Sequence, residues 1–242
     1  FNARRGARNF SRDELASAVS YCHLRGVKVY LTLNTLCSDR EMAEAVDCAV
    51  QASKLGADAA LIQDMGLVRA LRQAAPDLPL HASTQMALHN LDGVKQAADF
   101  GMTRAVLARE LSRRDIAYIC ERSPIEIEVF VHGALCMCYS GQCFMSSVIG
   151  GRSGNRGMCA QPCRLPYGWG EELATGHPLS LKDMSLAGHL KELQEMGVAC
   201  AKIEGRMKRA EYVYIVTKVY ADALREDREP TAEELSRLEQ AF

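Results

Sequence analysis

Helix-like and strand-like segments alternate regularly along this chain, and this alternation restricts the folds that it can adopt. Ser11 followed by Glu14 predicts a capping box that opens an amphipathic helix, which runs to about Arg25 and stops at Gly26. Residues 27–33, which are rich in β-branched and aromatic side chains, predict the next strand. Units that alternate in this way indicate a parallel sheet with helices packed on it.

The same pattern continues almost to the end of the chain. Further helices are predicted over residues 40–55, 67–74, 89–100, 112–122, 184–196 and 210–225, and further strands over residues 58–62, 78–82, 104–108, 125–131 and 200–203. With this many units in 242 residues, the best match is an α/β fold of the (β/α)8 TIM-like type, which typically takes about 250 residues. A doubly wound sheet is the alternative, because periodicity alone does not show that a sheet closes.

Polar side chains follow the ends of the predicted strands. They are Asn34, Gln63, Asp64, His81, Ser83, Thr84, Gln85, Arg109, Glu110, His132, Glu204 and Arg206. In (β/α)8 barrels the active site is built on the carboxyl ends of the strands, so we expect these residues to surround the mouth of the barrel. The alternative is that these loops are polar simply because they face solvent.

A cysteine- and glycine-rich segment interrupts the periodic pattern after the strand at residues 125–131. Six residues separate Cys136 from Cys143, three separate Cys159 from Cys163, and fifteen lie between the two pairs. Four converging thiolates suit zinc or an iron–sulfur cluster. The six-residue spacing is wider than that of most zinc sites and favours iron–sulfur, while zinc and unliganded thiols stay as alternatives. We therefore predict one domain over residues 1–242 with a metal-binding insertion at about 132–168.

The chain has ten cysteines, and five of them lie between positions 136 and 163. Secreted disulfide scaffolds are small and rich in loops, so this clustering indicates a metal site in a reducing, cytoplasmic compartment. The fifth thiol of the cluster, Cys138, is expected to lie beside the ligands or to be buried, and it could exchange with one of them. Single cysteines in apolar surroundings are expected to be small buried side chains, namely Cys22, Cys37, Cys48, Cys120 and Cys200.

Charge in the cysteine-rich segment has one sign. Residues 131–170 include Arg152, Arg156 and Arg164 and no acidic residue. Guanidinium groups pair with carboxylates and phosphates, which predicts an anionic ligand; the alternative is that they neutralise thiolates. In residues 202–209, Glu204 and Arg206 are predicted to point at the barrel mouth, unless they form a purely structural ion pair.

Several classes of protein lack support in this sequence. The net charge of −1 gives no global attraction to nucleic acid, so a contact with RNA would need a local basic patch. No apolar run approaches the roughly 20 residues of a membrane span, and no signal-peptide pattern opens the chain. The motifs HExxH, GxSxG, GxxxxGK[ST] and GxGxxG are also absent.

The string from Glu128 through residues 132–136, 140–143 and 146–147 resembles the signature of the collagenase-like peptidase family U-32. Matching motifs occur at Asn2-Ala3-Arg4, Asn34-Thr35, Gln63-Asp64, His81-Ala82-Ser83-Thr84-Gln85 and Lys202-Ile203-Glu204-Gly205-Arg206. The resemblance covers essentially the whole chain. Relative to that family, the chain lacks the first strand–helix unit and the second strand, so we expect a barrel truncated at its N-terminus and a fragment of a longer protein.

This resemblance implies an activity and a cofactor. The family includes proteins that hydroxylate nucleobases in tRNA or ribosomal RNA without molecular oxygen, and others that act in oxygen-independent ubiquinone hydroxylation. Such members carry a 4Fe–4S cluster on four cysteines, and prephenate is implied as the hydroxyl donor of the RNA enzymes. Transferred to this chain, the ligands are Cys136, Cys143, Cys159 and Cys163. The pair Cys159 and Cys163 places the chain nearer the RNA-modifying members.

The leading hypothesis is therefore an iron–sulfur RNA hydroxylase that acts on a pyrimidine in tRNA or 23S rRNA. Candidate residues are His132 and Glu204 for proton transfer, and Arg152, Arg156, Arg206 and Gln85 for binding RNA and a small carboxylate co-substrate. One alternative is a collagenase-like peptidase. Another is a non-catalytic iron–sulfur partner or ubiquinone-pathway subunit, in either a homo- or a hetero-oligomer.

Overall fold

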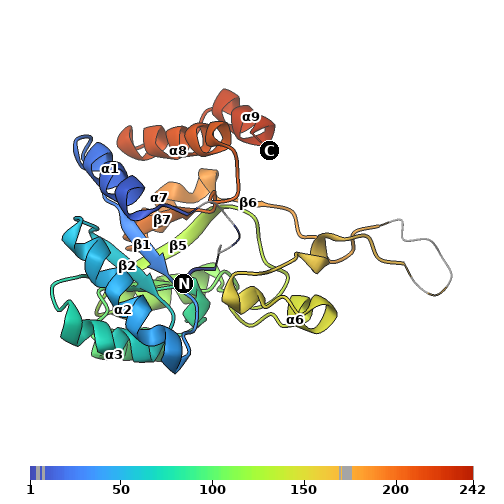
Figure 1. Ribbon diagram of the computed structural model, residues 1–242. Helices are drawn as coiled ribbons and strands as arrows, with labels where there is room; N and C mark the ends of the chain where they lie inside the picture. Colours follow the sequence, from blue (N-terminus) through green and yellow to red (C-terminus); the bar gives the residue numbers. More distant parts are fainter. Residues whose placement is uncertain (4–5, 7–8, 169, 171–175, 242) are drawn as a thin grey trace.

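A curved sheet of parallel strands forms the centre of the protein (Figure 1). The computed structural model describes residues 1–3, 6, 9–168, 170 and 176–241, so Arg4 of the first family motif lies outside the described residues. The parallel strands are β1 (Tyr30–Leu33), β2 (Ala59–Ile62), β3 (Leu80–Ala82), β4 (Arg104–Val106), β5 (Glu126–Gly133) and β7 (Cys200–Ile203), in that spatial order. A short strand, β6 (Met184–Ser185), pairs antiparallel with the end of β5.

Helices lie outside the sheet, and most of them connect one strand to the next (Figure 1). They are α1 (Arg12–His23), α2 (Asp39–Lys54), α3 (Met65–Ala74), α4 (Leu91–Asp99), α5 (Arg113–Arg122), α7 (Leu190–Glu195), α8 (Ala210–Arg225) and α9 (Ala232–Gln240). This arrangement confirms the prediction of an α/β TIM-like fold. In the described part of the chain, six parallel strands are present, whereas a closed barrel of this type has eight.

Local sequence explains where several helices begin. The predicted capping box is present: Glu14 N–H donates to Ser11 Oγ, and the Glu14 carboxylate accepts from Ser11 N–H. Ser112 caps α5 in the same way, with Asp115 as its partner. Each cap satisfies amide groups that the first helical turn leaves without partners.

The main core lies between the outer face of the sheet and the helices. On α2, the buried face consists of Ala45, Ala49 and Ala52, whose small side chains let the helix pack closely on the neighbouring strands. On α8, Tyr212, Val216, Val219, Tyr220 and Ala223 recur at helical spacing and are all buried. Burial of these apolar surfaces is the main force that holds the helices on the sheet.

The inner face of the sheet is more polar than a typical barrel interior. Leu61, Val106 and Phe130 form a small apolar layer there, separate from the main core. Below this layer, the buried carboxylate of Glu128 lies 2.6 Å from Lys202 Nζ and 3.4 Å from Arg104 Nη1. The stability of the barrel therefore depends on the pairing of the buried Glu128 carboxylate with these two cations.

The prediction of one helix over residues 184–196 was wrong. The segment contains β6, a 3₁₀ turn (Ala187–His189) and then the short helix α7. Met184 and Ser185 pair with Gly133 and His132 at the end of β5. Pairing with a strand that is distant in sequence here outweighs local helix propensity.

The cysteine-rich insertion leaves the barrel at the end of β5 and extends away from it (Figure 1). It contains a short helix, α6 (Met145–Gly150), and 3₁₀ turns at Gly154–Arg156 and Pro162–Arg164, which the sequence did not predict. Glycines with positive φ end two of these elements: Gly151 ends α6, and Gly157 ends the first 3₁₀ turn. Within the described residues, no helix combines the length and apolar character that crossing a membrane requires.

Candidate metal and active site at the carboxyl ends of the strands

The two cysteine pairs are joined by one arginine. Arg164, which follows Cys163, donates from Nη2 to the carbonyl of Leu135 at 2.8 Å, and Leu135 directly precedes Cys136. The same guanidinium also contacts Ser180 and Leu181. Arg164 thus holds the second cysteine pair against the first, a role that the sequence did not predict for it.

The four predicted ligands are neighbours. Burial raises the pKa of Cys163 and the Arg164 charge opposes this, while the nearby Cys136, Cys159 and Cys143 raise it further. Gln161 N–H donates to Cys159 Sγ at 3.3 Å, and all four thiols are free of disulfide bonds. Four free thiols and an amide donor suit the sulfur-rich environment of an iron–sulfur cluster.

The arrangement of the side chains does not form a site for a single metal ion in the described part of the chain. No group of three or more histidine, cysteine, aspartate or glutamate side chains there is placed to hold one ion. Metal binding by the four thiols, whether as an iron–sulfur cluster or as zinc, therefore stays a prediction.

Cys138 belongs to the same group of thiols. Burial raises its pKa, and the nearby Cys143 and Cys136 raise it further. The alternative that Cys138 exchanges with a ligand therefore stays open. By contrast, Cys22, Cys37, Cys48, Cys120 and Cys200 are half-buried rather than fully buried, and none lies in the insertion.

The insertion rests on the rim of the barrel at two places. On one side, Ser140 donates to Glu110, which follows β4. On the other side, Arg156 donates to Glu41 Oε1 at 2.5 Å and to the carbonyl of Leu36, beyond the end of β1. The Arg156 hydrogen bond is the main cause that lowers the pKa of Glu41 to about 2, and hydrogen bonds from Ser38 and the charge of Arg156 lower it further. These contacts bring the cysteines to the carboxyl ends of the strands.

An ion pair lies in the barrel mouth. Arg109 Nη2 is 3.2 Å from Glu204 Oε2, and the guanidinium carbon lies 3.8 Å from the centre of the Phe130 ring. Both charged side chains are largely buried, so their attraction is less screened than that of a surface pair. Glu204 was predicted to face this mouth, and its described partner is Arg109 rather than Arg206.

Amide side chains surround the same mouth. Asn34 donates to Ser83 Oγ at 2.9 Å and accepts from Ala3 N–H, which brings the N-terminal segment beside β1. Gln63 donates to the carbonyl of Gln85 at 3.1 Å, while its buried Oε1 has no hydrogen-bond partner among the described residues. An unsatisfied buried acceptor of this kind is a candidate contact for a ligand or water.

The three arginines predicted to bind an anion hold other parts of the structure. Arg152 Nε donates to the carbonyl of Met158, and Arg156 binds Glu41 and Leu36 as described. Arg206 is exposed and donates to the side chains of Asn2 and Asn9. The arginine that does lie in the barrel mouth is Arg109, which was not predicted from the sequence as an anion-binding residue. Its position directly after a predicted strand was the feature of the sequence that indicated this location.

His132 is turned toward α8 rather than toward the mouth. It is 1% exposed, and its Nδ1 lies 3.1 Å from Tyr220 Oη, which donates to the carbonyl of Val131. A register shift in β5 between Phe130 and His132 accounts for this direction. Burial lowers the pKa of His132. Its predicted role in proton transfer stays a prediction, and its surroundings are those of a packed core residue.

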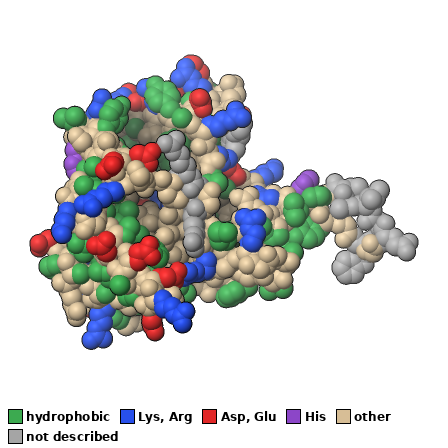
Figure 2. Space-filling view, viewed as in Figure 1, with side chains coloured by type: hydrophobic (Ala, Val, Ile, Leu, Met, Phe, Trp, Pro, Cys, Tyr) green, Lys and Arg blue, Asp and Glu red, His purple; other side chains and the backbone are tan. Residues whose placement is uncertain are grey.

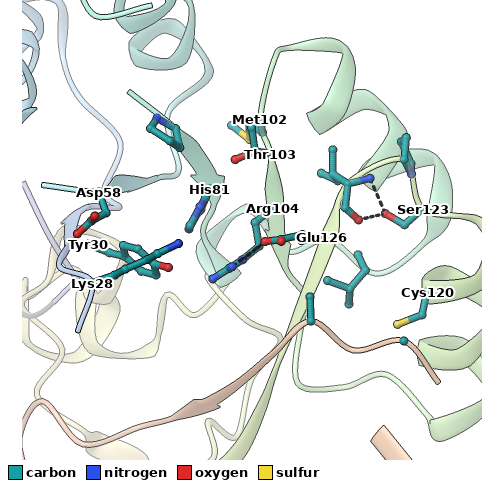
Figure 3. Close-up of a pocket in the computed structure, with 16 residues that line it drawn as sticks. Lys28, Tyr30, Asp58, His81, Met102, Thr103, Arg104, Cys120, Ser123 and Glu126 are labelled. Carbon is teal, nitrogen blue, oxygen red and sulfur yellow. Dashed lines mark hydrogen bonds and ion pairs between the residues drawn. The ribbon is translucent and has the colours of Figure 1, made fainter. Parts of the chain in front are cut away.

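A cavity of about 720 Å³ lies at the end of the barrel opposite the mouth. Figure 3 shows the residues that line it. Lys28, Tyr30, His81, Arg104 and Glu126 line it, at the amino ends of the strands. His81 was expected at the mouth, and the structure corrects this: it lies edge-on to Tyr30, with ring centres 5.0 Å apart. The amino end of a (β/α)8 barrel serves stability rather than catalysis, so we assign this cavity no part in the active site.

His81 makes stability depend on pH. Burial lowers its pKa to about 4, with Arg104 adding to the effect and Glu128 and Glu126 opposing it. Between about pH 6.5 and 4 the unfolded chain binds a proton that the folded protein does not, so stability falls as the pH falls. We expect a loss on the order of 3 kcal/mol across this range. Urea unfolding of the wild type and of His81→Gln at several pH values should show a shallower slope for the variant; equal slopes would contradict this assignment.

Comparisons with known proteins complete the description of the site. The family model described as peptidase family U32 matches residues 1–242. The chain is 40% identical over 236 residues to the "23S rRNA 5-hydroxycytidine C2501 synthase" of Escherichia coli (strain K12), covering 94% of this chain and 36% of that protein. It is 35% identical over 232 residues to the "tRNA hydroxylation protein P1" of Bacillus subtilis (strain 168), covering 91% and 55% respectively. It is also 32% identical over 238 residues to a "Collagenase" of Porphyromonas gingivalis (strain ATCC BAA-308 / W83), covering 91% and 57%. The chain therefore spans between 36% and 57% of the length of these relatives.

Proposed function

Because this chain belongs to peptidase family U32, we propose that it is the cluster-binding barrel of an RNA hydroxylase. Its substrate would be a pyrimidine in tRNA or 23S rRNA, and the reaction would not need molecular oxygen. The observation that carries this proposal is the gathering of four free thiols in the insertion that follows β5 and rests on the rim of the barrel. Relatives whose names include rRNA and tRNA hydroxylation support it.

The cofactor in this proposal is a 4Fe–4S cluster held by Cys136, Cys143, Cys159 and Cys163. When bound, such a cluster supplies one-electron redox chemistry. Gln161 N–H, which donates to Cys159 Sγ, would tune the reduction potential, because hydrogen bonds to ligand sulfur atoms do so in these centres. Arg164 would keep the two cysteine pairs at a fixed separation.

The co-substrate in this proposal is a small carboxylate such as prephenate. Arg109 is the best-placed cation for it, because its planar guanidinium lies inside the mouth and can pair with a carboxylate in place of Glu204. Glu204, which pairs with Arg109, would accept or hold a proton at Oε2. Gln63 Oε1 and Gln85 would supply further polar contacts.

RNA would approach over the exposed face of the insertion. Hydrophobic and basic side chains lie among other surface atoms on the part of the insertion visible in Figure 2, and residues 131–170 contain no acidic residue to repel phosphate. Tyr139 and Phe144 are each 63% exposed and lie close in sequence to Cys143. Exposed aromatic rings stack on unpaired bases, and arginine contacts phosphate, so Tyr139, Phe144 and Arg152 are the proposed contacts.

The test uses the full-length protein purified without air. We expect about four irons and four acid-labile sulfides per chain, as a single 4Fe–4S cluster requires. Nucleosides from tRNA and rRNA of a strain lacking the gene should lose one hydroxylated pyrimidine by mass spectrometry, and the wild-type gene should restore it. Zinc in place of iron, or an unchanged nucleoside profile, would contradict the proposal. Gelatin cleavage by the same preparation would instead favour the collagenase-like alternative.

A further inference from the structure

One carboxylate on the barrel binds the middle of the first cysteine loop. Glu110 Oε1 accepts from both Ser140 N–H and Ser140 Oγ, each at 3.0 Å. Ser140 is 3% exposed and the Glu110 side chain is 24% exposed, and a charged acceptor that binds two donors holds its partner more strongly than a neutral acceptor does. Glu110 follows β4 and is separated from Ser140 by thirty positions, so this contact joins the insertion to the rigid sheet.

The same carboxylate connects to a second rim residue. Glu110 Oε2 lies 3.3 Å from His89 Nε2, and the His89 ring lies edge-on to Tyr139 with ring centres 5.7 Å apart. His89 Nδ1 contacts the carbonyl of Ala87, which orients the ring. Two adjacent residues of the loop thus contact the rim, Ser140 through hydrogen bonds to Glu110 and Tyr139 through the ring of His89.

The loop fits tightly on the barrel beside this contact. A Cβ atom added to Gly141 would lie 2.5 Å from the carbonyl oxygen of Gln85, and Gly141 has a φ of +74°. Both the space and the backbone conformation therefore favour glycine. The loop has little freedom to shift toward the barrel, so its position depends on what prevents it from moving away.

We propose that Glu110 is a positioning residue that fixes the Cys136–Cys143 loop on the barrel rim and thereby places these two thiolates for the cluster. Ser140 lies four positions after Cys136 and three before Cys143, so release of Ser140 would free both. The opposing pair, Cys159 and Cys163, has its own anchors in Arg156 and Arg164. The placing of the two thiolates for a cluster rests on the proposed function, whereas the fixing of the loop by Glu110 does not.

The first readout needs no cluster. In metal-free full-length protein, Glu110→Ala should raise the rate at which iodoacetamide alkylates Cys143, measured by mass spectrometry, by at least about tenfold, the factor that corresponds to losing even one hydrogen bond to a charged acceptor. Glu110→Gln should stay near the wild-type rate, because its amide oxygen can still accept from Ser140. Glu121→Ala is the matched control, since Glu121 is an exposed acid on α5 paired with its neighbour Arg122. Equal rates for Glu110→Ala and wild type, or a Gln variant as reactive as the Ala variant, would overturn the proposal.

The second readout uses the cluster-loaded protein. Glu110→Ala should change the electron paramagnetic resonance spectrum of the reduced cluster and speed iron loss to a chelator several-fold, while Glu110→Gln and Glu121→Ala match the wild type. An unchanged spectrum with unchanged iron loss would refute the positioning role. If the wild-type protein holds no iron, the proposed function fails, and the alkylation rates still decide whether Glu110 fixes the loop.

Discussion

Replacing Cys159 with serine is expected to remove the iron from the protein and the hydroxylated nucleoside from the RNA. Serine preserves the size of the side chain but offers an oxygen in place of the soft thiolate that iron–sulfur clusters require. Cys159 receives an N–H hydrogen bond from Gln161 and packs beside Gly154, where the smaller serine oxygen fits without a clash. Iron content should fall well below about four per chain, and the product should become undetectable.

Two other cysteine variants make this result interpretable. Cys22→Ser changes a half-buried thiol on α1, outside the insertion, and should leave iron content and product unchanged. Cys138→Ser tests the fifth thiol, and full retention of iron would show that Cys138 is not a ligand. Retention of both iron and product in Cys159→Ser would contradict the ligand set and the proposed reaction together.

Replacing Glu128 with glutamine is expected to destabilise the fold more than any other single charge change discussed above. The Glu128 side chain is 4% exposed and pairs with Lys202 at 2.6 Å and Arg104 at 3.4 Å. Removing one member of a buried ion pair leaves the remaining charges poorly compensated, at a cost of about 3–5 kcal/mol. Because Lys202 is 27% exposed and can gain water contacts, we expect a value near the lower end. Urea unfolding of the full-length protein at neutral pH measures this difference.

The same network supplies a matched control. Glu126 also pairs with Arg104, at 2.6 Å, but its side chain is 56% exposed (Figure 3). An exposed ion pair contributes about 0–1 kcal/mol, so Glu126→Gln should change the free energy of unfolding little. Similar losses for Glu126→Gln and Glu128→Gln would show that burial does not set the strength of this network.

Much of the secondary structure could be read from local patterns. The capping box at Ser11 appears where the sequence placed it, because such a cap involves residues only three positions apart. The prediction of one helix over residues 184–196 was wrong because the structure there depends on residues that are distant in sequence. Whether Met184 and Ser185 extend or coil depends on their pairing with His132 and Gly133, which local propensity does not contain.

Side-chain direction was the least predictable property of the site. His81 and His132 both lie on strands, yet one lines the cavity at the amino end and the other packs against Tyr220. Arg206 donates to the side chains of Asn2 and Asn9, and its anion-binding role stays a prediction. Arg109 and Glu110 were predicted only as members of a polar series, and their separate roles follow from which face of the rim each occupies.

The sequence by itself determined the alternation of helices and strands, the helix cap at Ser11 and the spacing of the cysteines from which a metal site is predicted. These properties depend on residue type and on spacing within one segment, both of which the chain carries directly. Only the tertiary structure decided that Arg164 holds the two cysteine pairs together, that Glu110 carries the first loop, and that Arg109 pairs with Glu204 in the mouth. Each of these contacts joins residues between 29 and 95 positions apart, and such pairings exist only after the chain has folded.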